Sequence, residues 1–224
     1  MANFVYITLD TTAPKNVVVK VNNGATYASK QIADLLIGTS DSETIGYQLK
    51  IWGDVDNSND SNVQTLEEDS KWISYDTVKQ IKLSEGDGSK SVNIKVRDDV
   101  WNESVIASAV INLNTALPTI TITSQDVTRI SKVEGKNTVN FTFTSDVEFD
   151  EYVVKVVTSL DAGNDTGQAI NIESGSKNVF GNEGDYNTPI TVTIKGEDLE
   201  LANIGDGQKI VKVFVKSKSG IWSA

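Results

Sequence analysis

The sequence lacks two residue types on which much enzyme chemistry depends, because its 224 residues include no cysteine and no histidine. Without cysteine there is no disulfide, no thiolate nucleophile and no thiolate ligand. Without histidine, Ser-His-Asp and Cys-His catalysis are excluded, and the usual zinc, copper and haem sites lose their ligands. We therefore expect a protein that is not an enzyme and that needs no cofactor.

Long apolar runs are also absent. No stretch approaches the roughly 18 residues that a membrane-spanning helix needs. Residues 1–10 lack the basic region and the cleavage site of a signal peptide. We expect a chain that does not enter a membrane and that stays in the compartment where it was made.

Positive charge is scarce relative to negative charge. Lys and Arg total 20 and Asp and Glu total 31, which gives a net charge of −11. A polyanion would be repelled, so the balance argues against nucleic acid as a partner. Hydrophobic residues make up 38% of the chain, enough for a buried core.

What the chain does contain is a succession of short strand patterns. They alternate or are rich in β-branched residues, and clusters of Gly, Asn, Asp and Ser separate them. Ser29–Ile37 fits a helix or a strand equally well. The class is all-β, and many short strands without helical crossovers indicate β-sandwiches. The predicted strands are Val17–Val21, Tyr47–Trp52, Val92–Arg97, Val110–Leu113, Ile120–Thr123, Val139–Thr144, Tyr152–Val157, Thr191–Ile194 and Val211–Lys216.

An internal repeat organises these strands. Three blocks recur in the same order, at offsets of 104, 105 and 119 residues: Leu9–Pro14 with Leu113–Pro118, Tyr47–Ile51 with Tyr152–Val156, and Gly86–Lys90 with Gly205–Lys209. Such a series indicates a duplication. It predicts one sandwich domain over 1–114 and another over 115–224, with a long insertion at about 161–187 in the second.

The third block resembles a known signature. Gly86–Asp98, followed by Trp101–Ser104, is similar to the pattern DGxKTVxVxxxDxxGNxS of bacterial and bacteriophage immunoglobulin-like domains. The second copy is looser, since Ser217–Gly220 replaces the Asp-rich turn. The resemblance implies two tandem immunoglobulin-like sandwiches that serve display, adhesion or structural reinforcement on a phage head, tail or baseplate. It implies no catalytic residue.

Two acidic segments are candidates for chemistry. Asp54, Asp56 and Asp60 lie in an oxygen-rich run that could hold Ca²⁺, although the run fails the EF-hand pattern and is equally a solvated loop. Asp165-Thr166-Gly167 is the aspartic-protease tripeptide, but the apolar strand that should precede it is missing. A loop turn is the expected structure there.

Aromatic residues offer better binding candidates. By strand parity Trp52 lies on the face opposite the core, where it could stack on a sugar ring or anchor a protein interface. The alternative is that the loop 53–71 covers it. In the second domain two polar positions of this face become apolar, which indicates a buried interface. The residues concerned are Val153, Val157 and Phe214, in place of Gln48, Trp52 and Lys95.

The repeat also predicts an exchanged strand. Phe4–Leu9 precedes Pro14 as Ser108–Leu113 precedes Pro118, whereas the second copy stops soon after Trp222 without a matching strand. We hypothesise that residues 3–9, with Phe4 and Tyr6 at the interface, pair outside their own domain. They would complete the second domain of a neighbouring copy or augment a sheet of another virion protein. There are two alternatives. Phe4–Leu9 could pair within the first domain, or the natural chain could continue past Ala224 and supply its own strand.

Three functions follow from these observations. The first is a non-enzymatic phage structural protein, made in the host cytoplasm and mounted on the virion beside copies of itself and other virion proteins. The second is a module that binds bacterial surface polysaccharide through exposed aromatics. A hydrolase is the third, because acids are plentiful.

Overall fold

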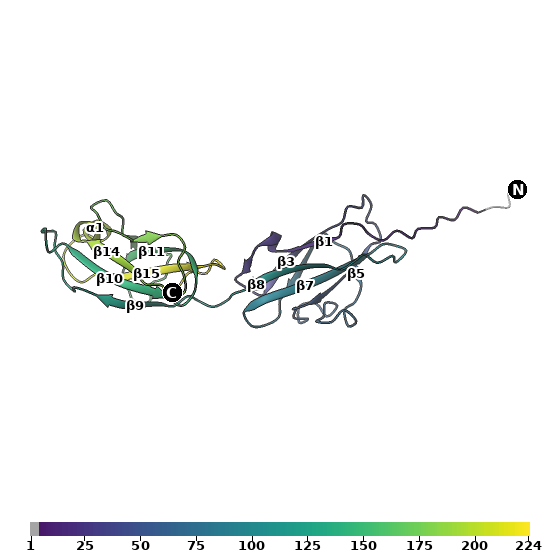
Figure 1. The fold of residues 1–224 in the computed structure, drawn as a ribbon, viewed down its shortest axis with the longest axis horizontal. Coiled ribbons are helices and arrows are strands. Elements are labelled where there is room, and N and C mark those ends of the chain that lie inside the picture. The colour runs from purple at the N-terminus through teal and green to yellow at the C-terminus, as the bar shows by residue number, and fades with distance from the viewer. Residues whose placement is uncertain (1–4) are drawn as a thin grey trace. The chain divides into compact units, whose positions relative to one another are not determined.

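The computed structural model describes residues 5–224 (Figure 1). The chain divides into two compact units, Met1–Thr115 and Ala116–Ala224, called unit 1 and unit 2 below. Both units consist mainly of β-strands, and the one α-helix within residues 5–224 is α1 (Gly196–Ala202). The predicted all-β class is confirmed. Nothing helical in this part of the chain is long and apolar enough to cross a membrane.

Unit 1 is a sandwich of two sheets, with strand orders β1-β3-β6 and β2-β8-β7-β4-β5. The chain changes sheet after β1, β2, β3, β5 and β6, which is the Greek-key arrangement of an immunoglobulin-like domain. The strands are β1 (Val18–Val21), β2 (Tyr27–Ala28), β3 (Ile32–Gly38), β4 (Gln48–Gly53), β5 (Ile73–Ser74), β6 (Val78–Lys82), β7 (Gly88–Arg97) and β8 (Ala107–Leu113). Ser29–Ile37, for which helix and strand were open, supplies β3.

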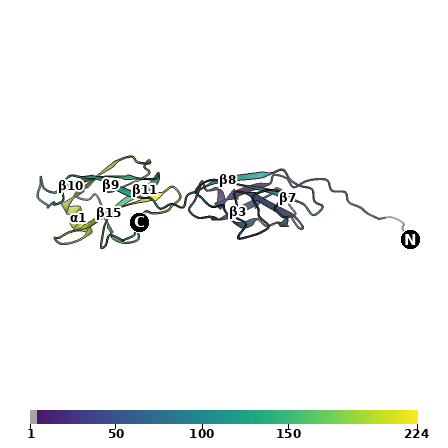
Figure 2. The same ribbon diagram turned by 90° about the horizontal axis from the view of Figure 1, so that it is seen from below.

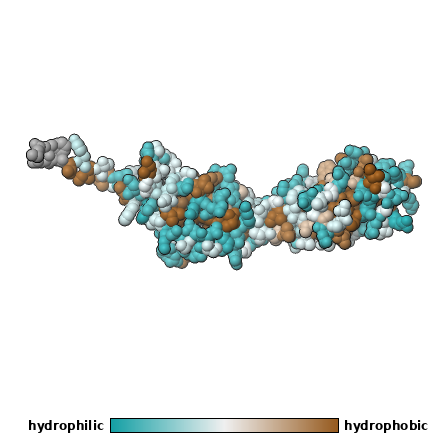
Figure 3. Space-filling model, turned by 180° about the vertical axis from the view of Figure 1, so that it is seen from behind, coloured by the Kyte–Doolittle hydropathy of each residue, from teal (hydrophilic) through white to brown (hydrophobic). Residues whose placement is uncertain are grey.

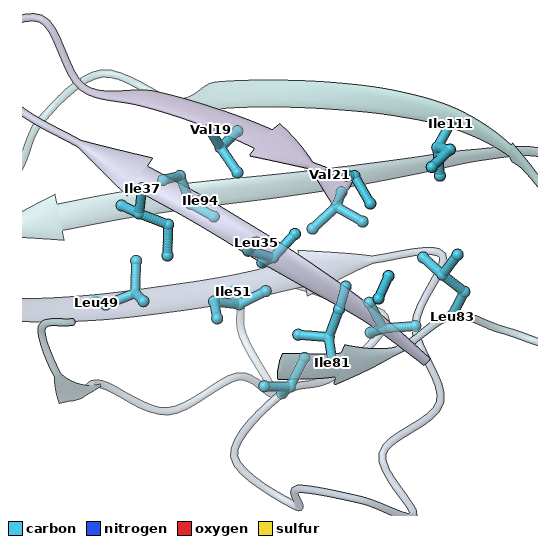
Figure 4. Close-up of a cluster of buried hydrophobic side chains, with 14 of the residues drawn as sticks. Val19, Val21, Leu35, Ile37, Leu49, Ile51, Ile81, Leu83, Ile94 and Ile111 are labelled. Carbon is cyan, nitrogen blue, oxygen red and sulfur yellow. The ribbon is translucent and has the colours of Figure 1, made fainter. Parts of the chain in front are cut away.

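The core of unit 1 follows from alternation along these strands. Successive side chains point to opposite faces, so every second residue of each sheet faces the other sheet. Figure 4 shows the result, with side chains of the two sheets meeting between the ribbons. The buried set includes Val19, Leu35 and Ile81 from the first sheet and Leu49, Ile51 and Ile94 from the second.

Unit 2 repeats this plan with fewer strands. Its first sheet has the order β14-β10-β9, and in its second sheet β11 lies between β15 on one side and the short β12 and β13 on the other. The strands are β9 (Ile120–Gln125), β10 (Thr138–Ser145), β11 (Phe149–Val157), β12 (Gln168–Ala169), β13 (Phe180–Gly181), β14 (Ile190–Lys195) and β15 (Ile210–Ser217). Phe143, Phe149 and Tyr152 form the aromatic centre of its core.

The repeated Gly-Asp-Gly-x-Lys block is a turn that its own lysine closes. In unit 1 the Lys90 ammonium donates to the Glu85 carbonyl at 2.9 Å, and in unit 2 that of Lys209 donates to the Gly205 carbonyl. The second glycine of each turn has a φ of +121° or +126°, a conformation that favours glycine. The turn therefore delivers β7 and β15 to the second sheet of each unit.

Candidate binding surfaces

One edge of β15 is open in unit 2. In unit 1 the equivalent strand, β7, has β4 on one side and β8 on the other. β15 pairs with β11 along its whole length, but on its other side residues 5–224 supply only the final turn, through Trp222 and Ser223. Within residues 5–224, no strand is hydrogen-bonded to the first half of β15, residues 210–213, on that side.

A serine clasp shows which backbone groups face this open edge. In unit 1 the Ser104 hydroxyl accepts the Val96 N–H at 3.1 Å, and the Ser104 N–H donates to the Val96 carbonyl at 2.8 Å. Ser223 and Val215 repeat both bonds in unit 2, at 3.2 and 2.8 Å. Because backbone groups alternate between the two edges of a strand, every second residue before Val215 also directs its N–H and C=O to the open side.

An apolar groove of about 460 Å³ lies beside this edge. Leu117, Ile120 and Ile122 contribute to it from the start of unit 2, and Val211 and Val213 from β15. Leu117 and Ile122 are more than half exposed. In unit 1 the corresponding side of the sandwich is closed by β8, whose Ile111 and Leu113 are buried in the core. Unit 2 therefore presents unpaired backbone next to uncovered apolar side chains.

The N-terminal segment is an apolar stretch whose side chains are exposed in unit 1. Residues 5–15 form no strand, and residues 5–10 run away from the sheets of unit 1 in both ribbon views (Figures 1 and 2). Val5, Ile7 and Leu9 are 80%, 86% and 85% exposed. The segment carries hydrophobic surface next to the grey atoms in Figure 3. Tyr6 is exposed as well, and Phe4 lies outside the described residues.

Trp52 is not available on the surface, since it is only 8% exposed. The loop that follows β4 returns over it, where Gln64 forms a β-bridge with Trp52 and accepts a hydrogen bond from the Gly53 N–H at 3.2 Å. Of the two alternatives left open by the sequence, the structure shows the covered one. Trp52 therefore cannot stack on a sugar unless the loop moves.

A different tryptophan pair occupies the solvent side of this sheet. The Arg97 guanidinium lies between the rings of Trp72 and Trp101, 4.4 and 4.7 Å from their centroids, and Gln48 accepts a hydrogen bond from its Nε at 2.7 Å. Trp101 is 69% exposed. Its φ is +71°, a costly conformation for a bulky residue. Both rings were visible in the sequence, but parity along β4 pointed to Trp52 instead.

The predicted interface at Val153, Val157 and Phe214 requires a correction. Phe214 and Val157 are 0% and 4% exposed within unit 2 itself. The segment between β11 and β14 covers them, because the Lys212 ammonium lies over the Phe214 ring and donates to the carbonyls of Leu160 and Ala162. Phe214 and Val157 are therefore buried within unit 2 itself and cannot form an interface with a partner, whereas Val153 is half-buried.

The acidic candidates are engaged separately. Asp54 accepts the Ser91 N–H, Asp56 pairs with Lys82 at 2.6 Å, and Asp60 pairs with Lys79 at 2.7 Å. The hydrogen bond from Lys82 lowers the pKa of Asp56 to about 2. In residues 5–224 no three acidic side chains gather in a way that could hold a metal ion. In the described residues, Asp54, Asp56 and Asp60 thus each have a separate partner and are not gathered into one cluster.

The protease-like tripeptide is a turn. The Thr166 N–H and hydroxyl both donate to the Gly163 carbonyl, and Gly167 has a φ of +77°. This is the loop conformation expected from the sequence. No strand presents Asp165 to a partner carboxylate, so the geometry gives the hydrolase hypothesis no support within residues 5–224.

Comparison with known proteins gives similarity at the level of fold. No family model matches the chain, and no curated protein matches it. Similar solved structures include fibronectin(III)-like modules of CbhA from Clostridium thermocellum, at 10% identity and a TM-score of 0.43, covering 92% of this chain and 90% of that chain. The D00-D0 domain of intimin is similar at 12% identity and a TM-score of 0.34, covering 93% of this chain and 96% of that chain. A carbohydrate-binding module of the β-sandwich superfamily is similar at 12% identity and a TM-score of 0.34, covering 96% of this chain and 100% of that chain. At these identities the likeness concerns the fold alone.

Proposed function

We propose that this chain is a non-enzymatic structural protein of a bacteriophage virion, a decoration or accessory protein of the head, tail or baseplate. The observation that carries the proposal is the open edge of β15 beside its apolar groove. A sandwich with an unpaired strand next to core side chains gains stability when a strand from another molecule is added. The edge that residues 116–224 leave open on β15 therefore supports a role in assembly with other proteins.

The buried polar groups support a structural role. Asp98 accepts the N–H groups of Val100 and Asn102 and so holds the turn before the serine clasp of unit 1. Asp198, at the start of α1, accepts those of Ser174 and Ser176. Each of these carboxylates satisfies backbone amides of its own unit, which is the work of a stable scaffold. The resemblance of Gly86–Asp98 to bacterial and bacteriophage immunoglobulin-like domains is consistent with a place on a virion.

The partners that follow from this proposal are other virion proteins and further copies of the chain, made in the host cytoplasm and incorporated into particles. Immunogold labelling of purified particles from the cognate lysate tests the proposal. We expect gold at one fixed place on the particle and co-sedimentation of the chain with particles through a density gradient. Complete particles that contain none of the chain, with all of it in the soluble fraction, would contradict the proposal.

A second candidate function, recognition of bacterial surface polysaccharide, is favoured by the strained and exposed Trp101. Bulky residues held at positive φ cluster at functional positions, and an exposed indole is a common platform for a sugar ring. The Arg97 and Gln48 side chains beside it would supply polar contacts.

A glycan array of wall and capsule polymers tests this candidate. If it is correct, the chain binds a polymer and Trp101→Ala abolishes the binding. Tyr186→Ala is the matched control, since it removes another aromatic ring that is more than half exposed, from unit 2. Absence of binding by the parent chain, or equal binding by both variants, rejects Trp101 as the platform.

A further inference from the structure

We propose that the open edge of β15 takes up residues 5–9 of a second copy of this chain as an added antiparallel strand. This proposal rests on the proposed function only in that several copies of the chain must meet in one assembly. The occupant of the groove is then residues 5–9 of a neighbouring copy, in a defined register with β15.

The N-terminal segment has the inward-facing pattern of a strand that β8 supplies in unit 1 and that residues 116–224 do not supply in unit 2. At the repeat offset of 104 residues, Ile7 and Leu9 correspond to Ile111 and Leu113 of β8, which are 1% and 2% exposed in the core of unit 1. Val5 corresponds to Ala109, which packs partly buried against the same core. Three exposed apolar side chains of the segment therefore match positions that are buried where the strand is present.

The ladder between β7 and β8 gives the register. There Val92 pairs with Ala109, Lys90 with Ile111 and Gly88 with Leu113. The repeat offsets of 119 and 104 residues convert these pairs into Val211 with Val5, Lys209 with Ile7 and Gly207 with Leu9. In this register Val5, Ile7 and Leu9 face the sandwich, whereas Tyr6 and Thr8 face solvent, as Val110 does in β8. The Val211 backbone groups already point to the open edge.

A polar contact that follows β8 in unit 1 has its matching residues in both the N-terminal segment and unit 2. In unit 1 the Thr115 N–H and hydroxyl donate to the Asp87 carboxylate at 2.9 and 2.8 Å, just after β8 ends. The same offsets lead from Thr115 to Thr11 and from Asp87 to Asp206. Hence the segment and unit 2 both retain the residue type needed for this bond, which would fix the end of the added strand.

Such an exchange joins unlike surfaces of two copies. The segment belongs to unit 1 of one copy and the groove to unit 2 of the next, so each copy can donate one strand and accept one. A contact of this kind forms rings if it closes and filaments if it does not. The assembly is therefore concentration-dependent, and a reciprocal exchange between two copies is the smallest ring that it can form.

Sedimentation of the full chain and two charge variants tests the proposal. Ile7→Asp places a carboxylate in the apolar groove, and we expect it to shift the chain to monomer. Thr8→Asp is the matched control, because in the proposed register its side chain faces solvent, and it should assemble as the parent does. Both positions are exposed in unit 1, so neither change disturbs the unit's core, which circular dichroism would verify.

Cross-linking tests the register, which the absence of native cysteine makes possible. Hydrogen-bonded antiparallel pairs have Cα atoms about 5.5 Å apart, within the range that a disulfide spans. On oxidation, a mixture of Val5→Cys and Val211→Cys chains should give a disulfide-linked dimer. A mixture of Thr8→Cys and Val211→Cys chains should remain largely unlinked.

Several outcomes would overturn the proposal. A parent chain that stays monomeric into the millimolar range would contradict the exchange between copies. The occupant of the β15 edge would then be a strand of another protein. Assembly that Ile7→Asp does not weaken would assign the contact to another surface. If a Val5→Cys/Val211→Cys double variant forms its disulfide only within one chain, the segment pairs with unit 2 of its own chain and not with that of a second copy. If any of these results is obtained while gold still labels the particles, the virion role is retained and the strand exchange is rejected. If the strand exchange is observed but the chain does not associate with particles, the exchange is retained and the virion role is rejected.

Discussion

The second sheets of the two units share a repeated centre but differ in what covers them. In unit 1 the edge of β7 is closed by β8, and the outer face is polar, with Lys95 paired to Glu67 at 2.7 Å and to Glu103 at 3.5 Å. In unit 2 the edge of β15 is open, and Phe214, in the place of Lys95, is buried under the insertion. The two units thus share the strands at the centre of this sheet but differ in the segments that pack against them.

Alanine substitution at the equivalent positions 214 and 95 should give the largest difference in stability loss between the two units. Phe214→Ala removes a fully buried ring and should lower the free energy of unfolding of unit 2 by about 3–5 kcal/mol. Lys95→Ala removes a partly exposed ion pair and should cost unit 1 less than about 1 kcal/mol. Urea unfolding followed by circular dichroism and calorimetry measures both. Equal costs would show that the outer face of unit 2 is no better packed than that of unit 1.

The buried Asp198 should make unit 2 acid-sensitive. Burial alone raises its pKa, but hydrogen bonds from Ser176 and Ser174 outweigh this effect and lower it. Because the folded pKa is lowered, the stabilisation is present at neutral pH and is lost as the pH falls below the ordinary aspartate value. Asp198→Asn should cost about 1–3 kcal/mol at neutral pH.

The acid dependence of that cost is the decisive measurement. Melting curves between neutral pH and about pH 3, below the ordinary aspartate pKa, should show the gap between the parent and Asp198→Asn narrowing. Glu197→Gln is the control, since this neighbouring carboxylate is exposed. A gap that stays constant with pH would contradict the assigned role of the Asp198 charge.

The serine clasps should prove equivalent despite their different surroundings. Ser104→Ala and Ser223→Ala each leave a backbone N–H, of Val96 or Val215, without its partner. We expect each to lower the stability of its own unit by about 1–2 kcal/mol. Chemical denaturation of the two variants provides the comparison. If only Ser104→Ala has an effect, the open edge of unit 2 already admits water to the clasp.

The turn position shared by Trp101 and Gly220 should show a smaller difference. Both residues have positive φ, and a Cβ at Gly220 would meet no atom within 4 Å. Gly220→Ala should therefore cost about 1 kcal/mol, from the backbone alone. Trp101→Gly relieves the same strain but loses the stacking on Arg97, so its net effect should lie within about 1 kcal/mol of zero. Thermal unfolding tests both, and a large loss in Trp101→Gly would give the stacking more weight.

Calcium should have the smallest effect. Asp56 and Asp60 are paired with lysines, and Asp54 holds a backbone amide. At constant ionic strength, added Ca²⁺ should leave the melting temperature of unit 1 unchanged. A melting temperature that rises steadily with the concentration of Ca²⁺ would reveal binding and would overturn this expectation.

Alternation and turn chemistry predicted much of the fold. All nine strands expected from the sequence are present, with bounds that shift by a few residues at most positions. The five-residue β6 was not predicted because its apolar residues, Val78 and Ile81, do not alternate with polar ones. The two-residue strands, such as β5 and β12, were missed because they are too short for a period to be seen. The helix α1 was missed for the same reason, although Glu197 and Asp198 form an acidic first turn of the kind that favours a helix start.

The candidate surfaces were harder to predict. Parity states which side chains point away from the core, but it does not state whether a loop covers them. Trp52 and Phe214 were both placed on the outer face, and in each case a long connection returns over the side chain. The N-terminal segment was different, because its interpretation depended on repeat offsets rather than on a covering loop. Its side chains are exposed in unit 1, and its pairing outside that unit stays a prediction.

The lysine that closes each Gly-Asp-Gly turn has a consequence for chemical footprinting. Lys90 is buried, and its ammonium is engaged by the Ser84 hydroxyl and the Glu85 carbonyl. An amine-acylating reagent reaches such a group only through transient opening of the turn. Lys20, exposed on β1, is labelled directly from solution. The ratio of the two acylation rates, read by mass spectrometry, therefore reports how often unit 1 opens, without any probe being added to the chain.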